Sequence, residues 1–157
     1  KNLLQPLPMP GQPEPGRLCV YGEEEHNSKR VLGFVLAAAN IKSTDFWKSS
    51  ADPYCVVNRT VVHEADPEEG IDEDIECIPI YRTEVARRTG RPRFKAMEAT
   101  ASQLVGGKGK DHEIIIEVYD WFRVSTDKYI GESVMTIEEI SKAFRESRPL
   151  VKPICVR

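Results

Sequence analysis

Short runs of apolar residues, several of them alternating with polar residues, recur along the chain and are separated by turn-forming residues. The run HEIIIEVYDW at 112–121 has the strongest strand pattern. PYCVVNRTVVH is rich in β-branched residues, and IECIPIYRTEVA alternates well. The other expected strands are RVLGFVLAAANI, YIGESVMT, LVKPICVR and the weaker PRFKAMEAT. Many short strands joined by loops are typical of an antiparallel β-sandwich.

Helical patterns are confined to two short segments. In TIEEISKAFRES, Thr136 and Glu139 have the spacing of a capping box, which predicts a short helix before the last strand. ASQL, at 101–104, is expected to form a further helical turn. The pattern therefore predicts an all-β fold with one short helix before its final strand.

The composition suggests one domain behind a linker. Residues 1–16 are rich in proline and glycine, so we expect an extended lead-in. The chain of 157 residues is 40% hydrophobic, which suits one hydrophobic core. We place the domain that contains this core in 17–157. Within it, 64–76 carries eight acidic residues and no basic one. Because this segment lacks EF-hand spacing, we expect a solvated insertion at about 63–77.

The formal net charge of −3 includes those eight carboxylates, so the rest of the chain is net positive. The run YRTEVARRTGRPRFK contains six cations, namely Arg82, Arg87, Arg88, Arg91, Arg93 and Lys95. A basic face suits an anionic partner, such as lipid headgroups or nucleic acid. The same residues also fit a solvated strand face with scattered charges, and charge alone does not separate these interpretations.

Motifs of the common enzyme classes are absent from the sequence. It contains no GxSxG, HExxH or dinucleotide-binding fingerprint, and GGKGKD lacks the Ser or Thr of a phosphate-binding loop. Four cysteines without metal-ligand spacing favour reduced thiols. No apolar run approaches the ~20 residues of a membrane-spanning helix. We therefore expect a non-catalytic protein whose membrane contact is peripheral.

Two loops that adjoin predicted strands each carry two aspartates. TDFWKSSADPY contains Asp45 and Asp52, and YDWFRVSTDKYIG contains Asp120 and Asp127. Ca²⁺ binds about six to eight oxygens, mostly from carboxylates and carbonyls. Because a β-sandwich can bring two loops together at one end, these four aspartates are candidate calcium ligands.

Four segments resemble successive motifs of the C2 domain family. They are AANIKSTDFWKSSADPYCVV, YRTEV, RPRFK and IIIEVYDWFRVSTDKYIGES, and they follow the family order from about Val31 to Ile140. The segments YRTEV and SQLVGGKGKDHEIIIEVYDW are most similar to the second C2 domain of copines. The resemblance implies an eight-stranded antiparallel sandwich that binds calcium and phospholipid at one end.

The resemblance also implies which residues bind calcium. In calcium-binding members, two aspartates of the first loop and three of the third form the site, and Asp45, Asp52 and Asp120 match three of them. The fourth position is occupied by Phe122, and the fifth carboxylate is displaced by one residue to Asp127. Two outcomes stay open, a single weak calcium site or the loss of calcium binding.

The same resemblance suggests how the domain meets a membrane. Apolar residues at the two loop tips suit the bilayer interface, and these are Phe46, Trp47, Phe122 and Val124. Trp121 directly follows a strand and is expected in the core. Some C2 domains bind anionic headgroups through a basic cluster on the concave face. The residues in the matching region are Arg82, Arg87, Arg88, Arg93 and Lys95.

These observations predict a peripheral membrane-targeting module that binds anionic phospholipid, with or without calcium. We expect it to act as a monomeric domain of a larger cytoplasmic protein, at the inner face of a membrane, and not to bind nucleic acid. Two alternatives remain. One is a protein-interaction module with a degenerate calcium site, and the other is an accessory domain of a lipid-acting enzyme or kinase.

Overall fold

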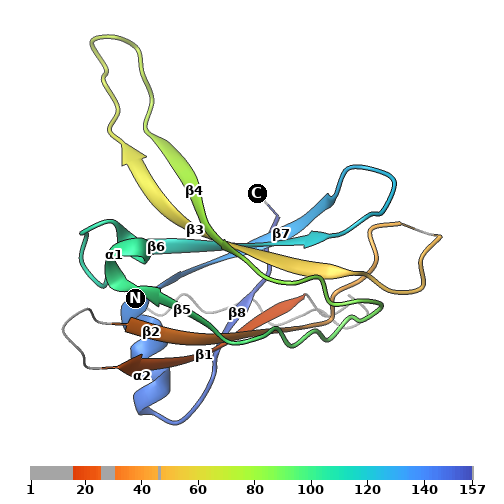
Figure 1. The fold of residues 1–157 in the computed structure, drawn as a ribbon. Helices are drawn as coiled ribbons and strands as arrows, with labels where there is room; N and C mark the ends of the chain where they lie inside the picture. Colours follow the sequence, from red (N-terminus) through yellow and green to blue (C-terminus); the bar gives the residue numbers. More distant parts are fainter. Residues whose placement is uncertain (1–15, 26–30, 46, 157) are drawn as a thin grey trace, which may run out of the picture.

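The computed structural model describes residues 16–25, 31–45 and 47–156. Eight strands form two four-stranded antiparallel sheets that pack face to face (Figure 1). Sheet A has the order β5-β2-β1-β8, and sheet B has the order β4-β3-β6-β7. The all-β, eight-stranded prediction is confirmed.

The strands of sheet A are β1 (Arg17–Glu25), β2 (Val31–Ala39), β5 (Met97–Thr100) and β8 (Leu150–Pro153). The strands of sheet B are β3 (Pro53–His63), β4 (Asp74–Arg82), β6 (Glu113–Asp120) and β7 (Lys128–Thr136). Among the described residues two helices complete the fold, α1 (Ala101–Val105) and α2 (Ile137–Arg145). Neither helix is long and apolar enough to cross a membrane, within the part of the chain described.

The core lies between the two sheets and follows the alternation of the strands. In β2 every second residue is buried, including Leu32, Phe34 and Leu36. From sheet B, Ile114 and Ile116 of β6 enter the same cluster. The period of two in β2 therefore places one face of this strand in the core and the other toward the surface.

The strand β1 is the element that the apolar pattern does not predict. It pairs with β2 along its whole length and with β8 over four residues. Its inward residues Leu18 and Val20 are buried, but GEEE follows them and hides the alternation. The helix predictions are confirmed, since Thr136 and Glu139 form a reciprocal capping box at α2 and Thr100 caps α1.

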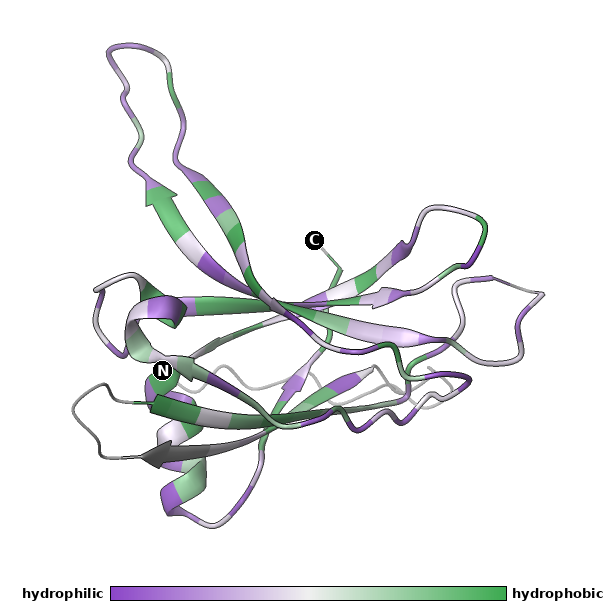
Figure 2. Ribbon diagram, viewed as in Figure 1, coloured by the Kyte–Doolittle hydropathy of each residue, from purple (hydrophilic) through white to green (hydrophobic). Residues whose placement is uncertain are grey.

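The acidic segment forms the tip of the long β3–β4 hairpin. Asp66 and Ile71 exchange two backbone hydrogen bonds, of 2.8 and 2.9 Å, and Gly70 between them has a positive φ of 71°. This tip projects away from the sandwich at the His63 end of β3, and hydrophilic residues predominate in it (Figures 1 and 2). The opposite end of β3, at Pro53, adjoins the aspartate loops.

The strand register brings these loops together. Pro53 at the start of β3 pairs with Asp120 at the end of β6, and Asp120 also pairs with Lys128 at the start of β7. The β2–β3 loop (40–52), the β6–β7 loop (121–127) and the β4–β5 segment (83–96) therefore lie at one end of the molecule (Figure 1). We call this the loop end.

Candidate functional site

The β4–β5 segment connects the two sheets at the loop end. Its first part bonds to sheet B and the start of β3, through Thr83 N to Cys55 O and Ala86 N to Pro53 O, both at 2.9 Å. Its second part bonds to sheet A, for example through Phe94 N to Leu36 O at 2.8 Å. The segment is therefore held along its length by backbone hydrogen bonds to both sheets.

Asp120 is the carboxylate that joins two of the loops. Its side chain is fully buried, and it accepts four hydrogen bonds from the β2–β3 loop. Oδ1 accepts from the backbone N–H of Asp52 at 2.9 Å and from Lys48 at 3.2 Å. Oδ2 accepts from the backbone N–H and the hydroxyl of Thr44, at 3.3 and 3.1 Å. This carboxylate therefore fixes the β2–β3 loop against the end of β6.

Lys48 reaches into the space between the two loops. Its Nζ lies 3.1 Å from Asp52 Oδ2 and 3.2 Å from Asp120 Oδ1, and it donates to the Trp121 carbonyl at 2.9 Å. The face of the Phe122 ring lies against it, with the centroid 4.0 Å from Nζ. Burial alone would lower the pKa of Lys48, but its bonds with Asp52 and Asp120 outweigh this and raise it.

Asp52 links the β2–β3 loop to the arginines of the β4–β5 segment. Its Oδ1 accepts a 2.7 Å bond from the backbone N–H of Arg88, a residue with a positive φ of 50°. The Arg87 Nε lies 3.6 Å from the same oxygen. Burial by itself raises the pKa of Asp52, but the Arg88 amide and the Lys48 ammonium bring it below its usual value. The carboxylate thus stays ionised and holds the arginine turn in place.

Asp127 turns away from the Asp52–Asp120 pair. Its Oδ1 accepts from the backbone N–H of Phe122 at 3.0 Å, and Oδ2 accepts from the Tyr54 hydroxyl at 2.7 Å. Arg82 lies 3.8 Å from Oδ2 and stacks on the Tyr54 ring. The Phe122 amide is the main cause of the lowered pKa of Asp127, while burial and the Asp127 carboxylate raise the pKa of Tyr54 to about 12.

The predicted calcium ligands are therefore brought to one end but not to one point. Asp45 accepts from the backbone N–H of Trp47 at 3.3 Å. Within 16–25, 31–45 and 47–156, no three His, Cys, Asp or Glu residues are grouped so that they could hold a metal ion. Because Ca²⁺ needs about six to eight oxygens, the donor set present does not fit a calcium ion. The space between Asp52 and Asp120 is filled by a lysine instead.

The loop tips differ in exposure. Trp47 is 78% exposed and Val124 is 93% exposed, and the two come from different loops of the same end. Phe122 is half-buried against Lys48 rather than projecting from the tip. The expectation of a core position for Trp121 is not met, since this residue is half-buried with Arg87 over its ring. Phe46 lies outside the described residues.

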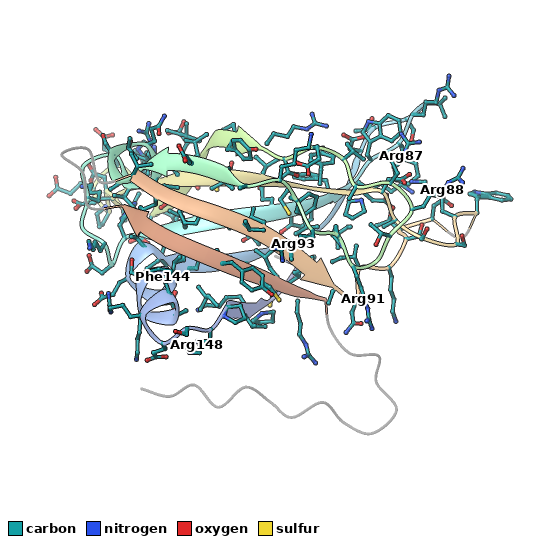
Figure 3. The ribbon with its side chains drawn as sticks, turned by 60° about the horizontal axis from the view of Figure 1, so that its bottom comes forward. Arg87, Arg88, Arg91, Arg93, Phe144 and Arg148 are labelled. Atoms are coloured by element: carbon teal, nitrogen blue, oxygen red, sulfur yellow. The ribbon has the colours of Figure 1, made fainter. Side chains whose placement is uncertain are left out.

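The predicted basic residues are spread over two faces rather than gathered on one. Arg82 lies on sheet B, whereas the Arg93 guanidinium lies over Tyr21 of sheet A. Lys95 is exposed, and its backbone N–H donates to Glu84. Figure 3 shows Arg87 and Arg88 at the loop end, with Arg91 and Arg93 nearer to sheet A.

A different surface lies around α2. A groove of about 630 Å³ is lined by Tyr21, Val35, Phe144 and Pro149, among others. Phe144 is 47% exposed. In Figure 3, Phe144 and Arg148 lie at the other end of the molecule from Arg87 and Arg88.

The sequence predictions do not include three residues that shape the loop end, namely Lys48, Thr44 and Tyr54. A signal for Lys48 exists, because a cation between two candidate ligands, four residues before Asp52, is well placed to pair with them. Thr44 and Tyr54 carry no comparable signal, since polar neighbours of aspartates are common in loops.

The chain is similar in sequence to a known domain family and to two known proteins. The model of the C2 domain matches residues 30–151. Copine-A of Dictyostelium discoideum is 29% identical over 125 residues, which are 80% of this chain and 19% of that protein. Protein BONZAI 1 of Arabidopsis thaliana is 29% identical over 131 residues, 83% of this chain and 20% of that protein. The chain thus spans about a fifth of the length of these relatives.

Solved structures show the same fold. A C2 domain of RIM from Drosophila has a TM-score of 0.60 at 16% identity, and the match covers 91% of this chain and 100% of that one. BON1-C2B has a TM-score of 0.55 at 21% identity, covering 85% of this chain and 73% of that one. C2 domains are typically non-catalytic modules that bind phospholipid membranes or proteins, commonly with calcium. By its family match, the chain belongs to the C2 domain family, and its relatives are copine-like.

Proposed function

We propose that this domain is a non-catalytic, peripheral membrane-targeting module that docks its loop end on anionic phospholipid. The observation that carries the proposal is the combination at this end of exposed apolar tips and exposed arginines. Trp47 and Val124 are exposed on two loops, and Arg87 and Arg88 are exposed on the β4–β5 segment of the same end. We place its action at the inner, cytoplasmic face of a membrane, within a larger protein.

The distribution of charge supports this orientation. Asp52 and Asp120 of the loop end are buried and bonded to Lys48 and to backbone amides, whereas Arg87 and Arg88 are exposed. The acidic hairpin tip lies at the far end of β3 (Figure 1). An anionic surface attracts the first end and repels the second, which favours docking with the loops toward the lipid.

The exposed tips add an apolar contribution. A tryptophan suits the interfacial region of a bilayer, where its ring is buried among headgroups and its N–H stays hydrogen-bonded. Val124 at 93% exposure has no comparable role inside the domain. Cations and apolar tips therefore act on two layers of the same membrane surface.

Cosedimentation with vesicles tests the proposal. The protein is mixed with phosphatidylcholine vesicles with and without phosphatidylserine, each in calcium and in chelator, at two salt concentrations. We expect binding that needs phosphatidylserine and weakens with salt. Each cation near an anionic surface contributes about 1 kcal/mol, which is roughly fivefold in affinity. Arg88→Ala should therefore lower the affinity by roughly fivefold, and Trp47→Ala should lower it further.

Matched controls come from the α2 end. Arg148→Ala removes an exposed arginine there, and Phe144→Ala removes an exposed aromatic ring, so neither should change vesicle binding. An absence of sedimentation in calcium and in chelator would contradict the proposal and favour a protein-interaction module. Equal losses in the α2-end controls would contradict the orientation.

A further inference from the structure

We propose that the Lys48 ammonium is the resident cation of this site, held between Asp52 and Asp120 in place of a metal ion. Here the resident cation means a positive charge that belongs to the chain and fills the space between the two loops. The inference concerns the same loops as the proposed function. Its test measures calcium binding and thermal stability, whereas the test of the proposed function measures vesicle binding. Either proposal can therefore fail while the other holds.

The N–H donors of Lys48 match the oxygen acceptors around it. A lysine ammonium has three N–H donors and no acceptor. Lys48 Nζ has three oxygen partners, Asp52 Oδ2 at 3.1 Å, Asp120 Oδ1 at 3.2 Å and the Trp121 carbonyl at 2.9 Å. Its hydrogen-bonding capacity is therefore filled. A calcium ion at the same place would have to gather several more oxygens.

The carboxylates of Asp52 and Asp120 are buried, which also favours a cation between them. The side chain of Asp120 is fully buried and that of Asp52 is 9% exposed, so both carboxylates need a nearby positive charge or hydrogen-bond donors. Lys48 supplies this charge from the same loop as Asp52, at position i−4. Because the cation is covalently attached, its local concentration does not depend on ions in solution.

Phe122 also favours a single positive charge over a divalent ion at this place. In the family pattern a carboxylate stands at this position, and a third negative charge beside Asp52 and Asp120 would favour a divalent ion. The ring instead lies with its face against the ammonium, with its centroid 4.0 Å from Nζ. An aromatic face attracts a single positive charge but offers no oxygen ligand. The lysine of one loop and the phenylalanine of the other are thus complementary.

The inference has a direct consequence for regulation. The loops reach the arrangement that presents Trp47 and the arginines without an ion signal, so docking of this domain should not respond to a rise in calcium. The residue that sets this property is Lys48, and Phe122 supports it.

Four forms of the domain test the inference: the natural sequence, Phe122→Asp, Lys48→Met, and the double variant. Calcium binding is measured by titration calorimetry and by the thermal midpoint in calcium against chelator. The natural sequence should give no heat and no shift. Phe122→Asp should also give neither, because the ammonium still fills the space. The double variant should bind calcium, and its midpoint should rise by about 3 °C or more in millimolar calcium.

Lys48→Met keeps the apolar stem but removes the charge, so Asp52 and Asp120 lose the cation that lies between them. Its midpoint in chelator should fall below that of the natural sequence, and calcium should restore part of the loss. Lys42→Met is the matched control, because Lys42 is an exposed lysine of the same loop and its loss should change neither quantity.

Three results would overturn the inference. They are calcium binding by the natural sequence, calcium binding by Phe122→Asp alone, and no calcium response of a folded double variant. A fall in midpoint without any calcium response would reduce Lys48 to an ordinary ion pair. Should the Lys48 variants not fold, the calcium titrations of the natural sequence and of Phe122→Asp still decide, because neither form changes Lys48.

Discussion

Carboxylates gather at both ends of β3, and the two groups lie in different surroundings. At the Pro53 end, Asp52 and Asp120 are buried and bonded to a lysine and to backbone amides. At the His63 end, the acidic residues of the hairpin tip are exposed, and Asp66 accepts bonds from the backbone of its own turn. The first group fixes three chain segments, whereas the second stabilises one turn.

The difference shows that a count of acidic residues does not give the charge that a surface presents. Asp52 and Asp120 present little negative charge outward, because they are buried and bonded to Lys48 and to backbone amides of the same end. The hairpin tip presents its carboxylates to water. A chain with a net charge of −3 can therefore have one end that suits an anionic partner.

Of the carboxylates at the two ends of β3, Asp120 should contribute most to the free energy of unfolding. Asp120→Ala removes the acceptor of four hydrogen bonds and leaves Lys48 with one carboxylate partner. Removing one partner of a buried ion pair costs about 3–5 kcal/mol of the free energy of unfolding. Urea denaturation followed by fluorescence measures this loss. A loss below about 1 kcal/mol would show that the loops are held by other contacts.

A smaller effect is expected at Asp127, whose side chain is 25% exposed. Asp127→Asn keeps the shape but weakens the bonds to the Tyr54 hydroxyl and the Phe122 amide. The expected loss is about 1 kcal/mol, the net value of one hydrogen bond. Tyr54→Phe removes the bond from the other side and should give a similar loss. A double variant that loses no more than either single variant would show that the two losses come from one shared contact.

The response to acid separates paired from exposed carboxylates. The pKa values of Asp52 and Asp127 are lowered in the folded state, so their contribution is complete above the unfolded value of about 4 and is lost as the pH falls through the folded values. The urea midpoint should stay level from pH 7 to about 5 and fall below about 4. Asp127→Asn should fall less steeply. A midpoint that rises on acidification would contradict this sign.

The smallest effect is expected at the hairpin tip. Glu68→Gln with Glu69→Gln should leave the urea midpoint unchanged, because both residues are exposed. Vesicle affinity should change by less than about twofold at physiological salt, since the tip lies beyond the length of β3 from the loop end and the screening length is about 8 Å. A large increase in vesicle affinity would place the hairpin, rather than the loops, near the membrane.

The fold could be predicted from the sequence where side-chain alternation is undisturbed. The strand β2 follows the period of two throughout, and the capping box at Thr136 marks the start of α2. The strand β1 escapes prediction because its apolar part is short and its stability comes from pairing with β2 and β8. Pairing between distant segments leaves no local pattern.

The location of the candidate site could be predicted from the sequence, but the contacts between its side chains could not. The family motifs put Asp45, Asp52, Asp120 and Asp127 at one end, and the structure does so too. Their partners decide what they do, and a partner such as Lys48 is identified by distance rather than by spacing. The basic run likewise divides between two sheets, because its residues turn a corner that the sequence does not show.

The hydrogen bonds of the β4–β5 segment have a consequence for the entropy of association. Fixing the backbone of a mobile residue costs about 1–2 kcal/mol, and a flexible arginine loop would lose that free energy on every residue ordered by a partner. Here the amides of Ala86 and Thr89 are already bonded to Pro53 and Ala51. The arginines therefore meet a surface from a backbone that is ordered beforehand, and slow hydrogen exchange at these two amides in the free domain would be its signature.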